Sequence, residues 1–150
     1  MTASTNETEY VTAWIAGQLF GIPIHQVHDV FEIGKITAVP LAQPEVAGVL
    51  NLRGRVVTAI DMRRRLGIAA GEKAARIAIG IDYGGEAYGL LVDSMGEVLR
   101  LPAASLDANP INMPAGWAQV STGLHRLEDR LMVVLDIDRV FDLQTGTLAA

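Results

Sequence analysis

The sequence predicts an all-β protein made of two small barrels, with a few short helices. Two observations indicate this fold. Short segments rich in β-branched or alternating apolar residues are separated by turns that contain Gly, Asp or Asn. Blocks of the chain also repeat in the same order, which indicates a duplication. About five short strands in each half are too few for a flat sheet, but they can curl into a barrel that removes its own edges.

The chain divides into three parts by composition. Residues 1–9 are polar and acidic and are expected to form a flexible leader, and residues 144–150 a short tail. Residues 10–143 are expected to form one domain that contains a pseudo-repeat of about 10–70 and 75–143, whose end strands could cross between the barrels. Residues 69–75 are the best candidate for a linker between the two copies.

The first copy begins with a hairpin. Strands are expected over 10–15 and 19–24, around a turn at 16–18, and Pro23 marks an edge or a bend. The apolar residues that follow recur at every third position, which we interpret as a kinked strand that changes face; they are Ile24, Val27, Val30 and Ile33. A short strand over 36–40 and a helical turn after Pro44 are expected next.

The stretch Gly48–Asp61 is expected to form a hairpin that leads into a capped helix. Gly54 can adopt the positive φ that a tight turn needs, and a β-branched strand follows it. Asp61 is a candidate N-cap for a helix over 62–66, and Gly67 stands where a helix usually ends. Asn51 and Arg53 are therefore presented on an otherwise apolar hairpin.

The second copy contains the same kinds of element. Strands are expected over 76–81, 87–92 and 96–101, followed by an irregular connection over 102–117. A further hairpin is expected from 120–127 and 130–135, and Asp136 is expected to cap a short helix that ends near Phe141.

The repeat is visible at two places in the sequence. Phe20–Ile24 corresponds to Tyr88–Val92, 68 residues later (88 − 20), and Val30 then corresponds to Val98. Gly48–Asp61 corresponds to Gly123–Asp136, 75 residues later (136 − 61). The copies differ in their turns, because the first has Asn-Leu-Arg-Gly where the second has Arg-Leu-Glu-Asp. Arg53 is thus specific to one copy, which makes it a candidate functional residue.

Composition argues against several functional classes. The net charge of −5 disfavours nucleic-acid binding, and the absence of Cys excludes disulfides and thiolate metal sites. We expect a cytoplasmic protein without direct membrane insertion, because no secretory signal is evident and no apolar run approaches the ~20 residues of a spanning helix. The apolar share of 50% indicates that some apolar surface remains outside the core, as at a partner site.

For three local motifs we prefer a structural explanation over a functional one. Arg63–Arg65 is interpreted as a solvated helix face rather than a nucleic-acid site. His25 and His28 have helical spacing but no third ligand nearby, so we expect no metal site. The run Leu91–Gly96 is similar to an aspartic-protease turn, but a second aspartate is missing at the repeat position and no catalytic residue is expected.

Taken together, the motifs of residues 10–143 resemble the CheW family of chemotaxis adaptors. The matching segments are Phe20–Ile24 with Val27, Gly48–Gly54, Ile60–Gly67, Gly89–Asp93, Glu97–Pro102 and Leu135–Val140. The resemblance implies two SH3-like five-stranded barrels, no cofactor and no catalytic site. It also implies an adaptor that bridges the helical cytoplasmic tip of a chemoreceptor and the regulatory domain of a histidine kinase, recruited to membrane receptor arrays.

The resemblance places the receptor in an apolar groove between the barrels. It carries over Val27 and Arg53 as partner-contacting residues. With their neighbours, the candidate partner-binding set is Val27, Asp29, Val30, Leu52, Arg53 and Gly54. The family often has Glu-Ile where this chain has Asp29-Val30, and Arg53 could pair with Asp29.

Two other functions remain open on the residues alone. One is an enzyme that uses a cleft of a small barrel, against which stands the missing nucleophile–base spacing. The other is an adaptor of the same type in a non-flagellar chemosensory pathway.

Overall fold

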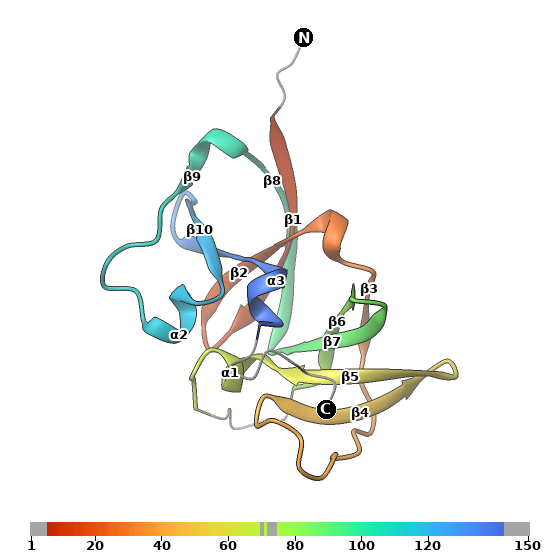
Figure 1. Cartoon of the computed structure of the whole chain (residues 1–150). Coiled ribbons are helices and arrows are strands. Elements are labelled where there is room, and N and C mark those ends of the chain that lie inside the picture. The colour runs from red at the N-terminus through yellow and green to blue at the C-terminus, as the bar shows by residue number, and fades with distance from the viewer. Residues whose placement is uncertain (1–5, 70, 72–74, 143–150) are drawn as a thin grey trace.

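The computed structural model describes residues 6–69, 71 and 75–142, which form eleven strands and three short α-helices (Figure 1). The strands are β1 (Glu7–Ile15), β2 (Gln18–Pro23), β3 (Asp29–Glu32), β4 (Val46–Leu52), β5 (Arg55–Asp61), β6 (Ile77–Tyr83), β7 (Glu86–Val92), β8 (Ser94–Pro102), β9 (Leu106–Asp107), β10 (Ser121–Arg126) and β11 (Leu131–Leu135). The helices are α1 (Met62–Arg65), α2 (Ala115–Ala118) and α3 (Ile137–Val140), with 3₁₀ turns η1 (Ile24–Gln26) and η2 (Ala103–Ser105). None of the helices within these ranges has the length and apolar character needed to cross a bilayer.

The strands form two sheets, which confirms the predicted all-β fold with two subdomains. The first barrel is the six-stranded sheet β8-β1-β2-β11-β10-β9, and the second barrel is the five-stranded sheet β3-β6-β7-β5-β4. Most neighbouring strands are antiparallel, but β11 pairs with β2 and β5 pairs with β7 in parallel. The two sheets therefore have equivalent strand orders, as a duplication requires, and β9 is the one addition.

Each barrel takes strands from both copies of the repeat. β1 and β2 pair within the sheet that otherwise comes from the second copy, whereas β3, β4 and β5 join β6 and β7. The chain crosses between the sheets after β2 and again after β7. The first hairpin of each copy is thus exchanged, and each barrel needs a hairpin from the other half of the sequence.

Several element boundaries also differ from expectation. Residues 24–26 are a 3₁₀ turn and β3 begins at Asp29, so the threefold apolar spacing marks a crossover rather than one kinked strand. β1 begins at Glu7, inside the expected leader, and pairs there with β8. In the expected strand 36–40 only Thr37 pairs, with Val49, and the helical turn expected over 45–47 does not form, because β4 already begins at Val46. Residues 70, 72–74 and 144–150, from the expected linker and tail, lie outside the described residues.

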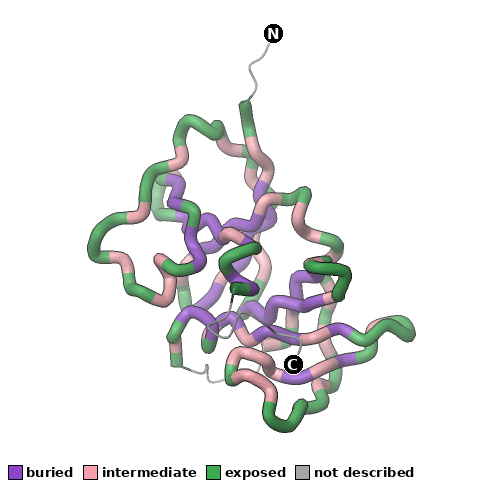
Figure 2. The backbone as a smooth tube through the Cα atoms, in the orientation of Figure 1, coloured by how far each residue is buried: buried purple, intermediate pink, exposed green. Residues whose placement is uncertain are grey.

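The largest apolar cluster lies between the two sheets, and we call it the inter-barrel core. It receives residues from both barrels and from the helices, among them Phe20, Ile60, Ile79, Leu90 and Leu135. Smaller clusters fill the inside of each barrel. In Figure 2 the buried backbone accordingly runs through the middle of the molecule, where the barrels meet. Because burial of apolar area is the main stabilising term, the two barrels stabilise each other.

The predicted helix caps are confirmed in both copies. The Asp61 carboxylate accepts a hydrogen bond from the Arg64 backbone N–H at 3.3 Å, and Asp136 accepts one from Arg139 at 3.4 Å. Gly67 has a φ of 76°, as expected for a residue that ends a helix.

Candidate functional site

Arg53 and Gly54 form the tip of the β4–β5 hairpin. Leu52 and Arg55 are the last paired residues, so the loop contains two residues, and their φ values are 55° and 81°. Positive φ at both positions is the requirement of a type I′ turn, which gives a strand twist that matches the sheet. The Gly54 N–H donates to the Asn51 side-chain oxygen at 2.9 Å. Positive φ at Gly54 was expected, but the same conformation at Arg53 was not, because arginine carries no signal for it.

The turn leaves the Arg53 side chain in solvent. Arg53 is exposed, and its guanidinium makes no hydrogen bond or ion pair with any residue that the structure describes. The Leu52 side chain lies differently, since it is half-buried and packs against the cluster inside the second barrel. Of the hairpin residues proposed to contact a partner, Arg53 is thus the one presented outward as a long side chain.

Val27 and Val30 lie at the edge of the inter-barrel core. Val27 is half-buried and packs against that core. Val30 is 44% exposed, and its partner across the β3–β6 pair is Ile79, which is fully buried in the same core. Side chains directly opposite each other in a sheet share a face. The apolar face between the barrels therefore continues outward to a solvent-exposed valine.

Asp29 does not pair with Arg53, although the sequence allowed that pair. Its carboxylate lies 3.6 Å from the His28 ring, whose other nitrogen lies 3.7 Å from Asp82. Asp82 in turn accepts from the Arg55 guanidinium at 2.9 Å. The start of β3 and the β4–β5 hairpin are thus connected, but through Arg55 and Asp82. These groups are about half exposed, and such pairs are worth about 0–1 kcal/mol each.

Val98 and Val56 are exposed apolar residues that the sequence did not mark as surface positions. Val98 on β8 is 55% exposed and is the repeat equivalent of Val30. Val56 on β5 is 65% exposed, two residues after the turn, and its repeat equivalent Leu131 is exposed too. The repeat alignment contained this signal, because a surface position in one copy predicts a surface position in the other.

The run Arg63–Arg65 is only in part the solvated helix face that the sequence indicated, because Arg64 is exposed whereas Arg65 is buried and Arg63 is half-buried. Arg63 pairs with Asp93 at 2.7 Å, and the Arg64 side chain donates to the Pro44 carbonyl. Arg65 is buried and donates to the carbonyls of Arg139 and Val140 at 2.8 Å each, which ties α1 to α3. Arg63 and Arg65 therefore hold the fold together, whereas Arg64 remains largely in solvent.

The side chains of the candidate catalytic and metal motifs are either engaged in contacts within the fold or not grouped together. The Asp93 carboxylate is bound by Arg63, which holds the pKa of that carboxyl below its usual range, and it also accepts the Ala16 N–H. Among the residues with described positions, no three His, Asp or Glu side chains are grouped to hold a metal ion.

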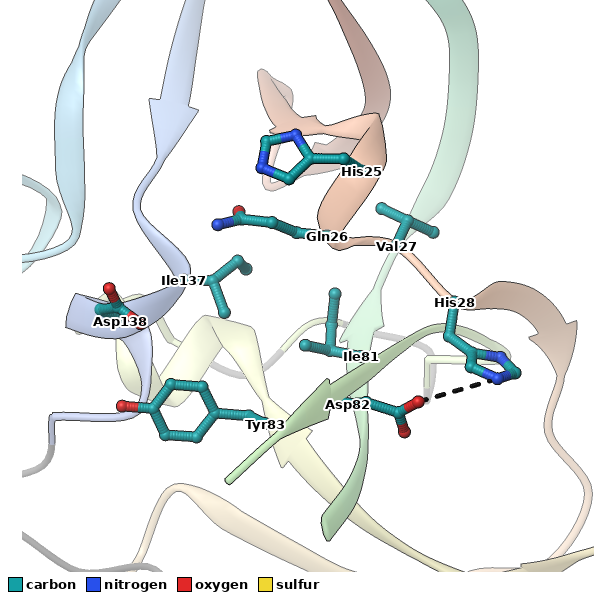
Figure 3. A pocket seen from close by; sticks show the side chains of 9 residues that line it. All are labelled: His25, Gln26, Val27, His28, Ile81, Asp82, Tyr83, Ile137 and Asp138. Carbon is teal, nitrogen blue, oxygen red and sulfur yellow. Dashed lines mark ion pairs between the residues drawn. The ribbon is translucent and has the colours of Figure 1, made fainter. Parts of the chain in front are cut away.

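A cleft of about 420 Å³ opens beside Val27, between η1, the end of β6 and α3 (Figure 3). Its lining residues are His25, Gln26, Val27, His28, Ile81, Asp82, Tyr83, Ile137 and Asp138. The walls therefore combine an apolar base with acidic and hydrogen-bonding groups, and Val27 belongs both to this cleft and to the edge of the inter-barrel core.

Comparison with known proteins agrees with this architecture over nearly the whole chain. The family model of the CheW-like domain matches residues 9–145. The chemotaxis protein CheW of Thermotoga maritima is 31% identical over 136 residues, which cover 91% of this chain and 89% of that protein. CheW of Bacillus subtilis is 28% identical and covers 99% of this chain and 97% of its own length.

A solved structure shares the fold. The crystal structure of the scaffolding protein TtCheW from Thermoanaerobacter tengcongensis superposes with a TM-score of 0.81 at 25% identity, and it covers 94% of this chain and 96% of that one. Proteins of this family are scaffold adaptors of chemotaxis and not enzymes. The family model, the relatives and the shared two-barrel fold together show that this chain belongs to the CheW family.

Proposed function

We propose that this adaptor couples transmembrane chemoreceptors to a chemotaxis histidine kinase. In this proposal one surface binds the helical hairpin at the cytoplasmic tip of the receptor, and another binds the regulatory domain of the kinase. The adaptor itself is cytoplasmic and is held at receptor arrays through its partners. Holding both partners raises their effective concentration, so a small change in the receptor reaches the kinase without any chemistry by the adaptor.

The observation that carries the receptor-binding proposal is the exposed edge of the inter-barrel core. Val30 continues a buried apolar face into solvent, beside the half-buried Val27. An amphipathic helix binds such a surface through apolar residues spaced three and four apart. Arg53 is free to bind a carboxylate or a helix carbonyl of the partner and so fix its register. Asp29 precedes Val30 in β3 and lies at the end of the series of contacts that runs through His28 and Asp82 to Arg55.

Val30→Asp and Arg53→Asn test this proposal with little disturbance of the fold. Val30 is exposed, and asparagine tolerates the positive φ of position 53. We expect each variant to bind the purified cytoplasmic fragment of the receptor about tenfold or more weakly, as for a hot-spot residue. Isothermal titration calorimetry measures the affinity, and circular dichroism checks the fold.

Leu131→Asp is the matched control, because Leu131 is exposed to the same degree as Val30 but lies in a hairpin of the other barrel. It should leave receptor affinity unchanged. If Val30→Asp and Arg53→Asn keep native spectra and full receptor affinity, the receptor does not bind at this edge.

A further inference from the structure

The duplication produces two equivalent seams, each between a short helix and a chain crossover. α1 follows β5 and lies beside the crossover between β7 and β8, as the Arg63–Asp93 pair shows. α3 follows β11 and lies beside the crossover between β2 and β3, where both line the cleft. In the repeat alignment Arg63 corresponds to Asp138 (138 − 63 = 75), and Asp93 corresponds to His25 (93 − 25 = 68).

The first seam is closed by a guanidinium. Arg63 donates to the two oxygens of Asp93 at 3.1 and 2.7 Å, and a third donor reaches the Ala69 carbonyl at 2.9 Å. Asp93 is held in place by the Ala16 N–H at 2.8 Å. A bidentate arginine–carboxylate pair is among the strongest charge-assisted contacts in proteins. This place in the fold therefore accommodates a planar cation between helix and crossover.

Within the part of the chain that the structure describes, the second seam has no such cation and is open. Asp138 stands in place of the arginine and His25 in place of the aspartate, so a carboxylate replaces the cation of the first seam and the long side chain is missing. The result is the cleft of about 420 Å³. In Figure 3 the side chains of Gln26 and Tyr83 extend toward α3, whereas His28 points away toward Asp82.

The groups that line this cleft favour a cation with several hydrogen-bond donors. The Gln26 side-chain oxygen is buried and has no hydrogen-bond partner, which is costly for an acceptor. Asp138 has no ion pair among the described residues, whereas the Asp82 carboxylate points toward His28 and is already shared with Arg55 and His28. Tyr83 presents a ring held by stacking on Phe141 at 4.8 Å, a surface on which a guanidinium can stack.

We propose that this cleft binds an arginine side chain of the receptor tip, in the place that Arg63 fills in the other seam. The inference rests on the proposed function, because Val27 links the cleft to the proposed receptor surface. The guanidinium donates to Asp138 and to the Gln26 oxygen, its stem contacts Ile81 and Ile137, and its plane faces Tyr83. The cleft thus adds a polar anchor to an otherwise apolar receptor interface.

The first test uses the isolated protein and N-acetyl-arginine methylamide as the probe, with binding followed by ¹H–¹⁵N NMR. One side chain buries little area, so we expect a dissociation constant on the order of millimolar, with shift changes at residues that line the cleft. Asp138→Asn and Gln26→Leu should each weaken binding about fivefold or more. Glu128→Gln is the matched control, since Glu128 is exposed in the β10–β11 turn, and it should bind normally.

Two further probes identify the chemistry. The citrulline analogue has the same shape without the charge, and equal binding of that analogue would overturn the assignment of a cation site. Free L-arginine tests whether the cleft is a small-molecule site rather than a site for a protein side chain. If free L-arginine binds much more tightly than the capped probe, the assignment to a protein side chain is overturned.

The second test measures the affinity of Asp138→Asn for the receptor fragment. We expect about a fivefold loss, as for removal of one charged hydrogen-bond acceptor. If capped arginine binds the cleft but Asp138→Asn keeps full receptor affinity, the arginine that the cleft binds does not come from the receptor. If wild-type protein binds the capped arginine but no receptor at all, the proposed function fails and the cation site stands.

Discussion

At the scale of single residues, His125 is a buried ionisable group with a consequence for stability. It lies inside the first barrel, 1% exposed, with one ring nitrogen 3.3 Å from the Tyr10 hydroxyl and the other without a partner. Burial lowers the pKa of His125 below its usual 6.5, and the nearby Asp107 only partly opposes this. The corresponding residue in the second barrel is Leu50, so the histidine occupies an apolar position.

We expect the protein to lose stability on mild acidification because of His125. Its pKa is lower in the folded state, so the unfolded chain binds the proton more readily and the free energy of unfolding falls as pH drops below 6.5. Urea denaturation from about pH 7.5 to about pH 5.5 measures this slope. His125→Leu should have a clearly shallower slope.

His25→Gln is the control, because His25 is exposed in the 3₁₀ turn, and it should keep the wild-type slope. Parallel slopes for wild type and His125→Leu would show that another group causes the acid sensitivity. Comparing slopes separates protonation from any constant cost of leaving the Tyr10 hydroxyl without its contact.

Also at the scale of single residues, the exposure of a side chain depends on its place in the sheet more than on its residue type. The apolar character of Val27 and Val30 was evident, but the sequence could not tell that one is half-buried and the other exposed. That difference depends on β3 lying at the sheet edge beside the inter-barrel core. The ion pair between Arg53 and Asp29 that the sequence allowed does not form. Its absence also depends on the folded arrangement, because Arg55 is the arginine that reaches across to Asp82.

At the scale of elements, the β4–β5 hairpin combines a structural and a recognition role in one turn. A non-glycine residue with positive φ costs roughly 1–2 kcal/mol. Arg53 bears this cost at a φ of 55°, whereas Gly54 avoids it at 81°. The arginine is therefore unfavourable for the turn itself, which is what a residue kept for binding would show.

We expect Gly54→Ala to destabilise the protein by about 1 kcal/mol, and Arg53→Gly to stabilise it by up to about 1 kcal/mol. A Cβ at position 54 meets open space, so the cost comes from φ alone. Urea denaturation measures both changes. Gly34→Ala is the matched control, since it also meets open space but without positive φ, and should be nearly neutral. Destabilisation by Arg53→Gly would contradict strain at that position.

Hairpins and capped helices were the elements best predicted from sequence. The turn at Gly54 and the caps at Asp61 and Asp136 depend on residues close together in the chain, so local chemistry determines them. The segment 24–33 was misread because a 3₁₀ turn and a strand in different surroundings together gave a regular apolar spacing. Local patterns do not show where a chain leaves one sheet for another.

At the scale of the whole molecule, strand exchange makes the two barrels interdependent. The β1–β2 hairpin belongs to a sheet whose other strands all come from residues beyond 93, and β3–β5 need the β6–β7 hairpin. The inter-barrel core also takes residues from both sheets. Cutting the chain between the copies therefore removes strands from both barrels at once.

We expect fragments 1–70 and 71–150 to be unfolded separately and to form a native complex when mixed. Each fragment alone lacks the partners of its strands and exposes most of the shared core. Circular dichroism and ¹H–¹⁵N NMR of the fragments, singly and together, check this. A fragment that unfolds cooperatively by itself would contradict interdependence of the barrels.

The all-β class, the duplication, the local turns and caps and the family could all be predicted from the amino-acid sequence, because each depends on neighbouring residues or on motifs read in order. Three features became evident only from the folded molecule: which strands share a barrel, the exposure of Val30 beside the inter-barrel core, and the closure of one seam by Arg63 while the other is an open cleft. These features depend on contacts between residues far apart in the chain. The two copies have similar patterns, so the pairing of their strands is set by packing of the shared core rather than by any single segment.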